Sequence, residues 1–150
     1  MTLVDIALSE PHRRSVDSTA HAFVTKFAEF WRHPSPRGLP ALLHDDVILR
    51  QPLAPPATGI DEAQRQFGKF CRCLQELHAQ VERWSGTQDL LFVEFTVVAR
   101  LGRDTLEWPT VNRLILRDGK ASERVAYFDP LAVLPALLRH PSVGWRWLKP

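Results

Sequence analysis

The sequence has few of the residues that build disulfide or metal frameworks. Only two of its 150 residues are cysteines, Cys71 and Cys73. Two positions apart on a helix they point in different directions, so they cannot bridge each other. The six histidines are scattered, without HExxH or CxxC spacing, and the GxGxxG, P-loop and GxSxG motifs are missing. We therefore expect reduced thiols, no metal ion and no cofactor.

Long apolar runs and an excess of one charge are also missing. No apolar run approaches the ~18–20 residues of a membrane span, and Arg13 and Arg14 follow the apolar N-terminal stretch instead of preceding it, unlike a secretory signal. Lysine and arginine number 19 against 17 acidic residues, whereas proteins that bind nucleic acid carry a clustered basic excess. The sequence predicts a cytoplasmic protein without membrane or nucleic-acid partners.

What the chain has is the composition of one folded domain. Hydrophobic residues make up 45% and charged residues 24%, which is ordinary for a globular protein, and domains most often span ~100–150 residues. We expect a single domain over 1–150, with a loose N-terminal arm at 1–14. The tail at 139–150 holds Trp145 and Trp147, which we expect to pack over the opening of the domain or against a partner.

Apolar periodicity predicts helices in the first half of the chain. Phe23, Phe27, Phe30 and Trp31 share one face of a helix over about 18–32. A short helix near 39–43, a strand at 47–53 and a helix at about 61–74 follow. The proline-rich stretch at 54–59 is predicted to be irregular.

The second half changes to a period of two, which predicts strands. These are expected at about 77–84, 90–101, 106–117 and 121–128, with a hairpin turn at Asp118-Gly119. Asp129 is expected to cap a closing helix, which Pro135 kinks. The predicted class is α+β, with helices on one face of a curved sheet. The predicted buried stripe of the closing helix consists of Leu131, Leu134, Leu137 and Leu138.

Two stretches of the sequence resemble the nuclear transport factor 2-like superfamily. The first is FAEFWRHPSPRGLPALLHDDVILRQPLAPPATGIDEAQRQF, and the second, similar to the SnoaL-like and limonene epoxide hydrolase branches, is LRDGKASERVAYFDPLAVL. The resemblance covers about residues 18–138. It implies a cystatin-like cone, in which a curved sheet wraps around a long N-terminal helix and encloses a deep, mostly apolar pocket. It also implies homodimers through the outer face of the sheet.

The catalytic residues of limonene epoxide hydrolases are not matched. That pattern places an arginine and two aspartic acids where this sequence has Phe95, Val97 and Ala126. The acid that SnoaL-like cyclases use near the end of the sheet would correspond to Asp129. Strand parity turns Asp129 away from the pocket, and its role as a helix cap accounts for its presence.

The steroid delta-isomerase pattern is not matched either. Its aspartic acid base, tyrosine and second aspartic acid correspond here to Gln51, Phe27 and Asn112. Two amides therefore remain, and each can donate and accept hydrogen bonds without titrating. Gln51 and Asn112 are the best candidates for catalytic residues, while both of these known activities are disfavoured.

Strand alternation and the helical stripes together predict the residues that line the pocket. Their charge places Arg50, Arg113 and Arg124 on the outer face, as a solvated or dimer-facing set paired across strands with Glu94, Glu107 and Glu123. The predicted ligand-binding wall holds no carboxylate and no histidine. It consists of Phe27, Trp31, Leu49, Gln51, Phe70, Leu74, Phe95, Val97, Trp108, Thr110, Asn112, Ala126 and Phe128.

Three functions fit such a wall. The first is a protein that binds a small apolar molecule, oriented by Gln51, Thr110 and Asn112 through hydrogen bonds. The second is an isomerase, cyclase or dehydratase that uses the same amides to polarise its substrate. The third is a dimeric interaction domain whose outer face, not its pocket, carries the function.

Overall fold

The computed structural model describes residues 10–149, with side chains from residue 18 onward. The predicted arm at 1–9 lies outside the described residues. In chain order the elements are α1 (Glu10–Phe30), the 3-10 helix η1 (Pro36–Ala41), β1 (Leu43–Gln51), β2 (Ala54–Thr58), α2 (Ile60–Cys73), β3 (Gln75–Gly86), β4 (Leu90–Leu101), β5 (Asp104–Arg117), β6 (Lys120–Tyr127), the 3-10 helix η2 (Pro130–Ala132), α3 (Leu134–Arg139) and α4 (Pro141–Leu148).

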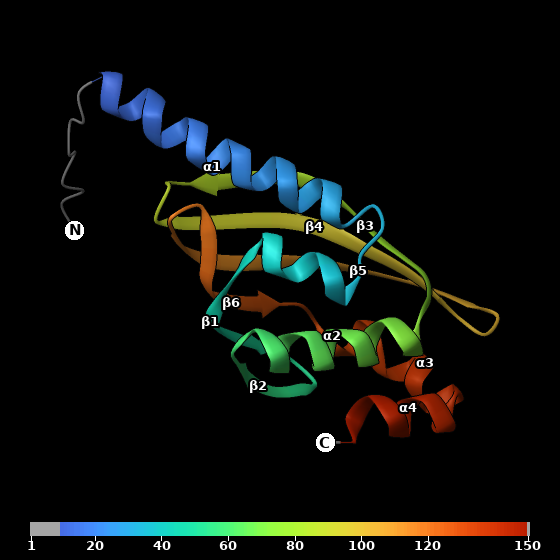
Figure 1. Ribbon diagram of the computed structural model, residues 1–150. Helices are drawn as coiled ribbons and strands as arrows, with labels where there is room; N and C mark the ends of the chain where they lie inside the picture. The colour runs from blue at the N-terminus through green and yellow to red at the C-terminus, as the bar shows by residue number, and fades with distance from the viewer. Residues whose placement is uncertain (1–9, 150) are drawn as a thin grey trace, which may run out of the picture.

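The strands form one six-stranded sheet in the order β2-β1-β6-β5-β4-β3. Every pair is antiparallel except β1 and β6, which run parallel. Helix α1 lies across one face of the sheet, and α2 and α4 lie close together at one end (Figure 1). The predicted α+β class, a curved sheet wrapped around a long N-terminal helix, is confirmed.

Side chains along the strands alternate between a buried inner face and a more exposed outer face, and this alternation determines which face of the sheet packs against the helices. Along β4, for example, Val93, Phe95 and Val97 are buried, whereas the residues between them are more exposed. The predicted hairpin turn is confirmed, because Asp118 and Gly119 both adopt positive φ angles, 51° and 77°, as a tight two-residue turn requires.

The start of α1 corrects one prediction. The helix begins at Glu10, so residues 10–14 are helical and do not belong to a loose arm. Pro11 then occupies the first turn, the one place where a helix tolerates proline without losing a hydrogen bond.

The proline-rich stretch at 54–59 corrects another. Ala54–Thr58 forms strand β2, which pairs with β1 on one side only, because it lies at the edge of the sheet. Proline lacks an N–H to donate, and an edge strand does not need that donor on its free side. Pro55 and Pro56 are exposed, while Ala57 is fully buried opposite Leu49.

The closing helix is divided into three pieces instead of one kinked helix. Pro135 and Pro141 each lie in the first turn of a new helix, α3 and α4. Asp129 accepts a hydrogen bond from the backbone N–H of Leu131 at 2.9 Å, so the predicted cap is confirmed. The division rotates the predicted stripe, leaving Leu131 and Leu138 exposed (69% and 79%), while Val133, Ala136 and Leu137 are buried.

None of the helices within residues 10–149 has both the length and the apolar character needed to cross a membrane. Cys71 and Cys73 are both free thiols, in agreement with their spacing.

Candidate functional site

A cavity of about 90 Å³ lies between the inner face of the sheet and the helices. We call this cavity the chamber. Phe27 of α1 and Trp31, the residue that follows the helix, contact Phe95 of β4 there, with ring centroids 5.1 and 5.4 Å from that of Phe95. Phe67 and Phe70 of α2 continue the aromatic wall. A water molecule needs ~10–15 Å³ of such space, so the chamber has room for several waters or a small organic group.

The structure brings the predicted wall residues together. All of them except Leu74 line the chamber. Leu74 is 4% exposed and packs in the core instead. It caps the C-terminus of α2 with an extended backbone, so its side chain no longer follows the helical stripe from which it was predicted. Ligand contact by the other residues stays a prediction.

Several lining residues were missed. Phe67 lies three positions before Phe70 on the same face of α2, so helical spacing could have found it. Leu39, Leu42 and Leu43 lie in or beside η1 at the start of β1, where periodicity gives no signal. Arg124 was placed on the wrong face. The missed residues are Phe23, Phe30, Leu39, Leu42, Leu43, Ala63, Gln66, Phe67, Leu114, Arg124 and Trp147.

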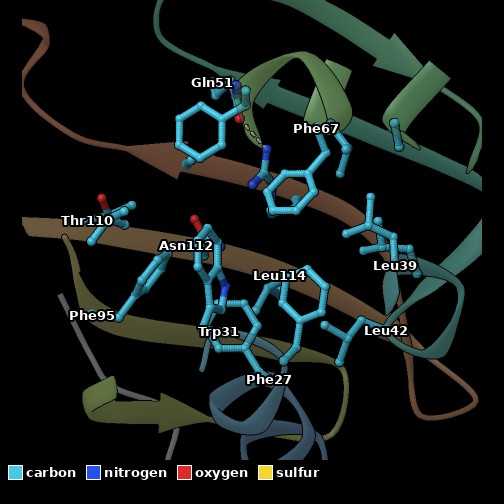
Figure 2. Close-up of a pocket in the computed structure, with 18 of the residues that line it drawn as sticks. Phe27, Trp31, Leu39, Leu42, Gln51, Phe67, Phe95, Thr110, Asn112 and Leu114 are labelled. Carbon is cyan, nitrogen blue, oxygen red and sulfur yellow. Dashed lines mark hydrogen bonds between the residues drawn. The ribbon is translucent and has the colours of Figure 1, made fainter. Parts of the chain in front are cut away.

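Five polar side chains interrupt this apolar lining. Gln66 donates a hydrogen bond to the backbone oxygen of Pro55 at 3.0 Å. We call the other four the polar patch: Gln51, Thr110, Asn112 and Arg124. They come from β1, β5 and β6, the three adjacent strands in the middle of the sheet. Arg124 lies beside Leu114 in the register of β5 and β6, two positions from the Asn112–Ala126 pair. Figure 2 shows Gln51, Thr110 and Asn112 directed into the space that Phe27, Trp31 and Phe67 bound on the helix side.

Only one hydrogen bond is made within the polar patch. Arg124 Nη2 donates to Gln51 Oε1 at 2.6 Å. The Thr110 hydroxyl, both amide atoms of Asn112 and Arg124 Nε are buried and have no partner among residues 18–149. An unpaired buried polar group costs ~1–3 kcal/mol, so the folded protein carries a free-energy cost here that a bound molecule would relieve.

Arg124 corrects the prediction that it lies on the outer face. Its side chain lines the chamber, and no carboxylate of residues 18–149 forms an ion pair with it. Burial lowers the pKa of Arg124 to about 10, which still leaves the guanidinium charged at neutral pH. Arg50 and Arg113 do face outward as predicted, both near Glu123, at 3.6 and 2.5 Å.

A second, larger hollow of about 400 Å³ opens outside the chamber, and we call it the outer cleft. It shares Gln51, Gln66, Phe70 and Trp147 with the chamber, so these residues separate the two. Trp147 of α4 packs edge-on against Phe70 at 5.1 Å. The tail therefore covers the opening, as expected for Trp147, whereas Trp145 is 71% exposed.

The outer cleft is predominantly basic. Four cationic side chains line it, with Glu62 as the single acidic one. Glu62 forms an ion pair with Arg65, which leaves three cations in excess of that pair. The cationic residues are Arg65, Lys69, Arg146 and Lys149.

The chemistry available in the chamber depends on which of its lining groups can gain or lose a proton. The chamber lining contains no aspartate, glutamate or histidine, and residues 10–149 contain no cluster of three or more such ligands or cysteines that could hold a metal ion. Burial raises the pKa of the Cys71 thiol of α2 to about 11, so it is not a thiolate at neutral pH. The chamber can enclose an organic molecule and polarise its oxygens, but no lining carboxylate or imidazole transfers protons.

A long helix across one face of a mixed six-stranded sheet, with a pocket between them, is the ketosteroid isomerase-like fold. Within that class, the SnoaL-like domain matches residues 24–124. The chain belongs to the SnoaL-like domain family, as the two stretches of sequence predict. At the level of sequence, no curated protein matches the chain.

Solved structures share the fold at low sequence identity. A hypothetical protein of Catenulispora acidiphila, crystallised with trimethylamine, has a TM-score of 0.69 at 16% identity over 75% of this chain and 89% of its own. A putative SnoaL-like polyketide cyclase of Jannaschia has the same score and identity over 79% and 91%. An epoxide hydrolase of M. tuberculosis, similar to limonene epoxide hydrolase, scores 0.67 at 15% identity over 85% and 95%.

Proposed function

We propose that this protein binds a small, largely apolar organic molecule in the chamber. Asn112 carries the proposal. It is fully buried, it lines an otherwise apolar cavity, and neither atom of its amide has a partner among the described side chains. A ligand with one polar atom at this depth would restore the missing hydrogen bonds.

The arrangement of the aromatic wall favours a ligand with a flat body. Phe27, Trp31 and Phe95 contact one another in tilted and edge-to-face arrangements, which present ring faces and edges to the space beside them. Two of the structures that share the fold are named as a polyketide cyclase and an epoxide hydrolase, whose names imply organic substrates.

Binding is tested by thermal unfolding with a panel of steroids, terpenoids, aromatic polyketides and fatty acids. A ligand raises stability as RT ln(1 + [L]/Kd), so at least one class is expected to raise the Tm in a concentration-dependent way. Asn112→Leu, which keeps the size of the side chain, is expected to weaken that ligand at least tenfold. Gln80→Met, the same kind of change on an exposed amide of β3, is the control.

No Tm rise with any class at millimolar concentration contradicts the proposal. Equal affinity of Asn112→Leu and Gln80→Met for the bound ligand contradicts the role of Asn112.

A second candidate function, an isomerase, cyclase or dehydratase, is favoured by one specific observation. The guanidinium of Arg124 and the amide of Asn112 lie on the same buried face, where donors stabilise a carbonyl oxygen that develops negative charge. Because no lining group titrates near neutrality, turnover of a carbonyl substrate is expected to be flat from about pH 6 to 9. A bell-shaped profile that follows a pocket residue would contradict this mechanism.

We further propose that the partner of this chain is a second copy of itself, bound through the outer face of β4, β5 and β6. Phe92, Ile115 and Tyr127 are exposed there, at 41%, 38% and 52%. The Arg113–Glu123 ion pair lies in the same region, so the surface has a positive and a negative group side by side. In an isologous dimer, where the same surface of each copy faces the other, these opposite charges can meet across the interface. Light scattering is expected to give twice the chain mass, and Phe92→Glu is expected to give the single-chain mass.

A further inference from the structure

The partly buried charge of Arg124 is unusual because no carboxylate among residues 18–149 forms an ion pair with it. Its single recorded hydrogen bond is to the amide oxygen of Gln51, which is neutral. An ion taken from water into a protein interior loses several kcal/mol of solvation unless an opposite charge is close. The neighbouring strand shows the alternative, since Arg113 pairs with Glu123 at 2.5 Å.

We propose that the ligand of the chamber is an organic anion, whose ionised oxygen pairs with Arg124 while its apolar body packs on the aromatic wall. This inference rests on the proposed binding function and adds the chemical class of the ligand. A carboxylate and an ionised enol both supply the required oxygen.

The free donors of the polar patch match an anionic oxygen. Arg124 Nε, Asn112 Nδ2 and the Thr110 hydroxyl are all buried and unpaired. Arginine presents its N–H groups in a planar fork that fits two oxygens at once. Gln51 holds one end of the guanidinium at 2.6 Å, which fixes its orientation without neutralising its charge.

The outer cleft supports the same class of ligand. Arg65, Lys69, Arg146 and Lys149 line the hollow that adjoins the chamber, with Glu62 alone opposing them. A recess lined by one sign of charge raises the local concentration of the opposite ion and speeds its association. A molecule that enters through the outer cleft therefore meets positive charge first, and meets it again at Arg124.

The test is calorimetry at about pH 7.5 with three probes that share a naphthalene body. These are 2-naphthoate, 2-hydroxy-1,4-naphthoquinone, which is an ionised enol at this pH, and the neutral 2-naphthamide. At least one anion is expected to bind ten or more times more tightly than the amide, since hydrogen bonds to a charged group contribute about twice as much as neutral ones. Which anion binds better identifies the source of the charge.

Variants then assign the preference to Arg124. Arg124→Met is expected to abolish the preference for the anion and to change the affinity for 2-naphthamide by less than about threefold. Arg113→Met removes the same charge from the outer face and is expected to keep the preference. Arg124→Lys keeps the charge but not the fork, so a reduced preference is expected. It also serves as the test if Arg124→Met does not fold.

The contribution of the outer cleft is measured separately, through the rate at which anions associate. Lys69→Met combined with Arg146→Met is expected to slow anion association at low salt and to flatten its salt dependence, without changing the affinity for the amide.

Two outcomes overturn the inference in different ways. Equal affinity for the anions and the amide, unchanged in Arg124→Met, removes the anionic class and leaves the proposed binding function intact. Absence of binding by all three probes, together with no response to the wider panel, overturns both.

Discussion

Arg113 and Arg124 lie on adjacent strands, yet they meet opposite conditions. Arg113 points to the outer face, where Glu123 neutralises it at 2.5 Å. Arg124 points to the inner face, where a neutral amide is its recorded partner. On the outer face Arg113 has a carboxylate partner, although its Nε makes no hydrogen bond. On the inner face Arg124 has no carboxylate partner, and the Thr110 hydroxyl and the Asn112 amide are also unpaired among residues 18–149. A protein optimised only for stability would pair or remove such groups, so the contrast supports the proposal that the ligand binds at the inner face.

The largest expected effect is a difference in the free energy of unfolding between a variant on the inner face of β4 and a variant on its outer face. Phe95 is 2% exposed on the inner face and Phe92 is 41% exposed on the outer face of the same strand. Phe95→Ala should lower the free energy of unfolding by about 3–5 kcal/mol, because it removes a ring from the aromatic wall. Phe92→Ala should change it by at most about 0.5 kcal/mol in the single chain. Urea denaturation measures both, and similar losses would contradict the assignment of faces.

The next effect separates the two arginines. Arg124→Met replaces a partly buried guanidinium that has no ion-pair partner with an apolar chain of similar length, so the unliganded protein should become more stable by about 1–4 kcal/mol. Arg113→Met breaks a partly exposed ion pair and should lower stability by about 0.2–1 kcal/mol. Urea denaturation of the two variants is therefore expected to show changes in the free energy of unfolding of opposite sign. A loss of stability in both variants would show that Arg124 has a structural partner.

Asn112 gives a smaller effect of the same kind. Its amide is buried without partners, so Asn112→Leu should raise the free energy of unfolding by about 1–2 kcal/mol while weakening the ligand. Asn112→Asp, in contrast, places a carboxylate diagonally across from Arg124 in the sheet. That carboxylate should pair with the guanidinium and prevent anions from binding, which calorimetry with the anionic probes checks.

The smallest effect concerns pH and lies far from the chamber. His140 and then Arg139 donate hydrogen bonds to Asp104 and hold the pKa of its carboxyl below the usual range. A depressed carboxyl pKa adds stability that is present above about pH 4 and is lost as pH falls through the folded-state pKa. Asp104→Asn should therefore make stability less dependent on pH below about pH 4. Chamber variants should leave that acid dependence unchanged.

Much of the chamber could be predicted because alternation along a strand is a local property. Phe95, Val97, Thr110 and Asn112 follow from parity alone once one inward residue is chosen. Arg124 shares the parity of Ala126, two positions away, and the same rule would have placed it inward. It was assigned to the outer face by its charge, since arginine is seldom buried.

Other errors came from contacts that the sequence does not show. The prolines at 55 and 56 argue against a strand unless one knows that the segment lies at the edge of the sheet. Leu131 and Leu138 fit a continuous helix but are exposed, because Pro135 and Pro141 each start a new helix. These outcomes depend on tertiary arrangement, which overrides local pattern.

The parallel pairing of β1 with β6 also has a consequence for the order of folding. Gln51 and Arg124 form a hydrogen bond although 73 positions separate them. The chain between β1 and β6 forms all the remaining strands of the sheet, β2 to β5. Contacts of such long sequence separation form slowly, because closing the loop costs entropy before any contact repays it. During synthesis, β1 therefore exposes an unpaired edge until β6 has left the ribosome. The contact between Gln51 and Arg124 is therefore among the last to form.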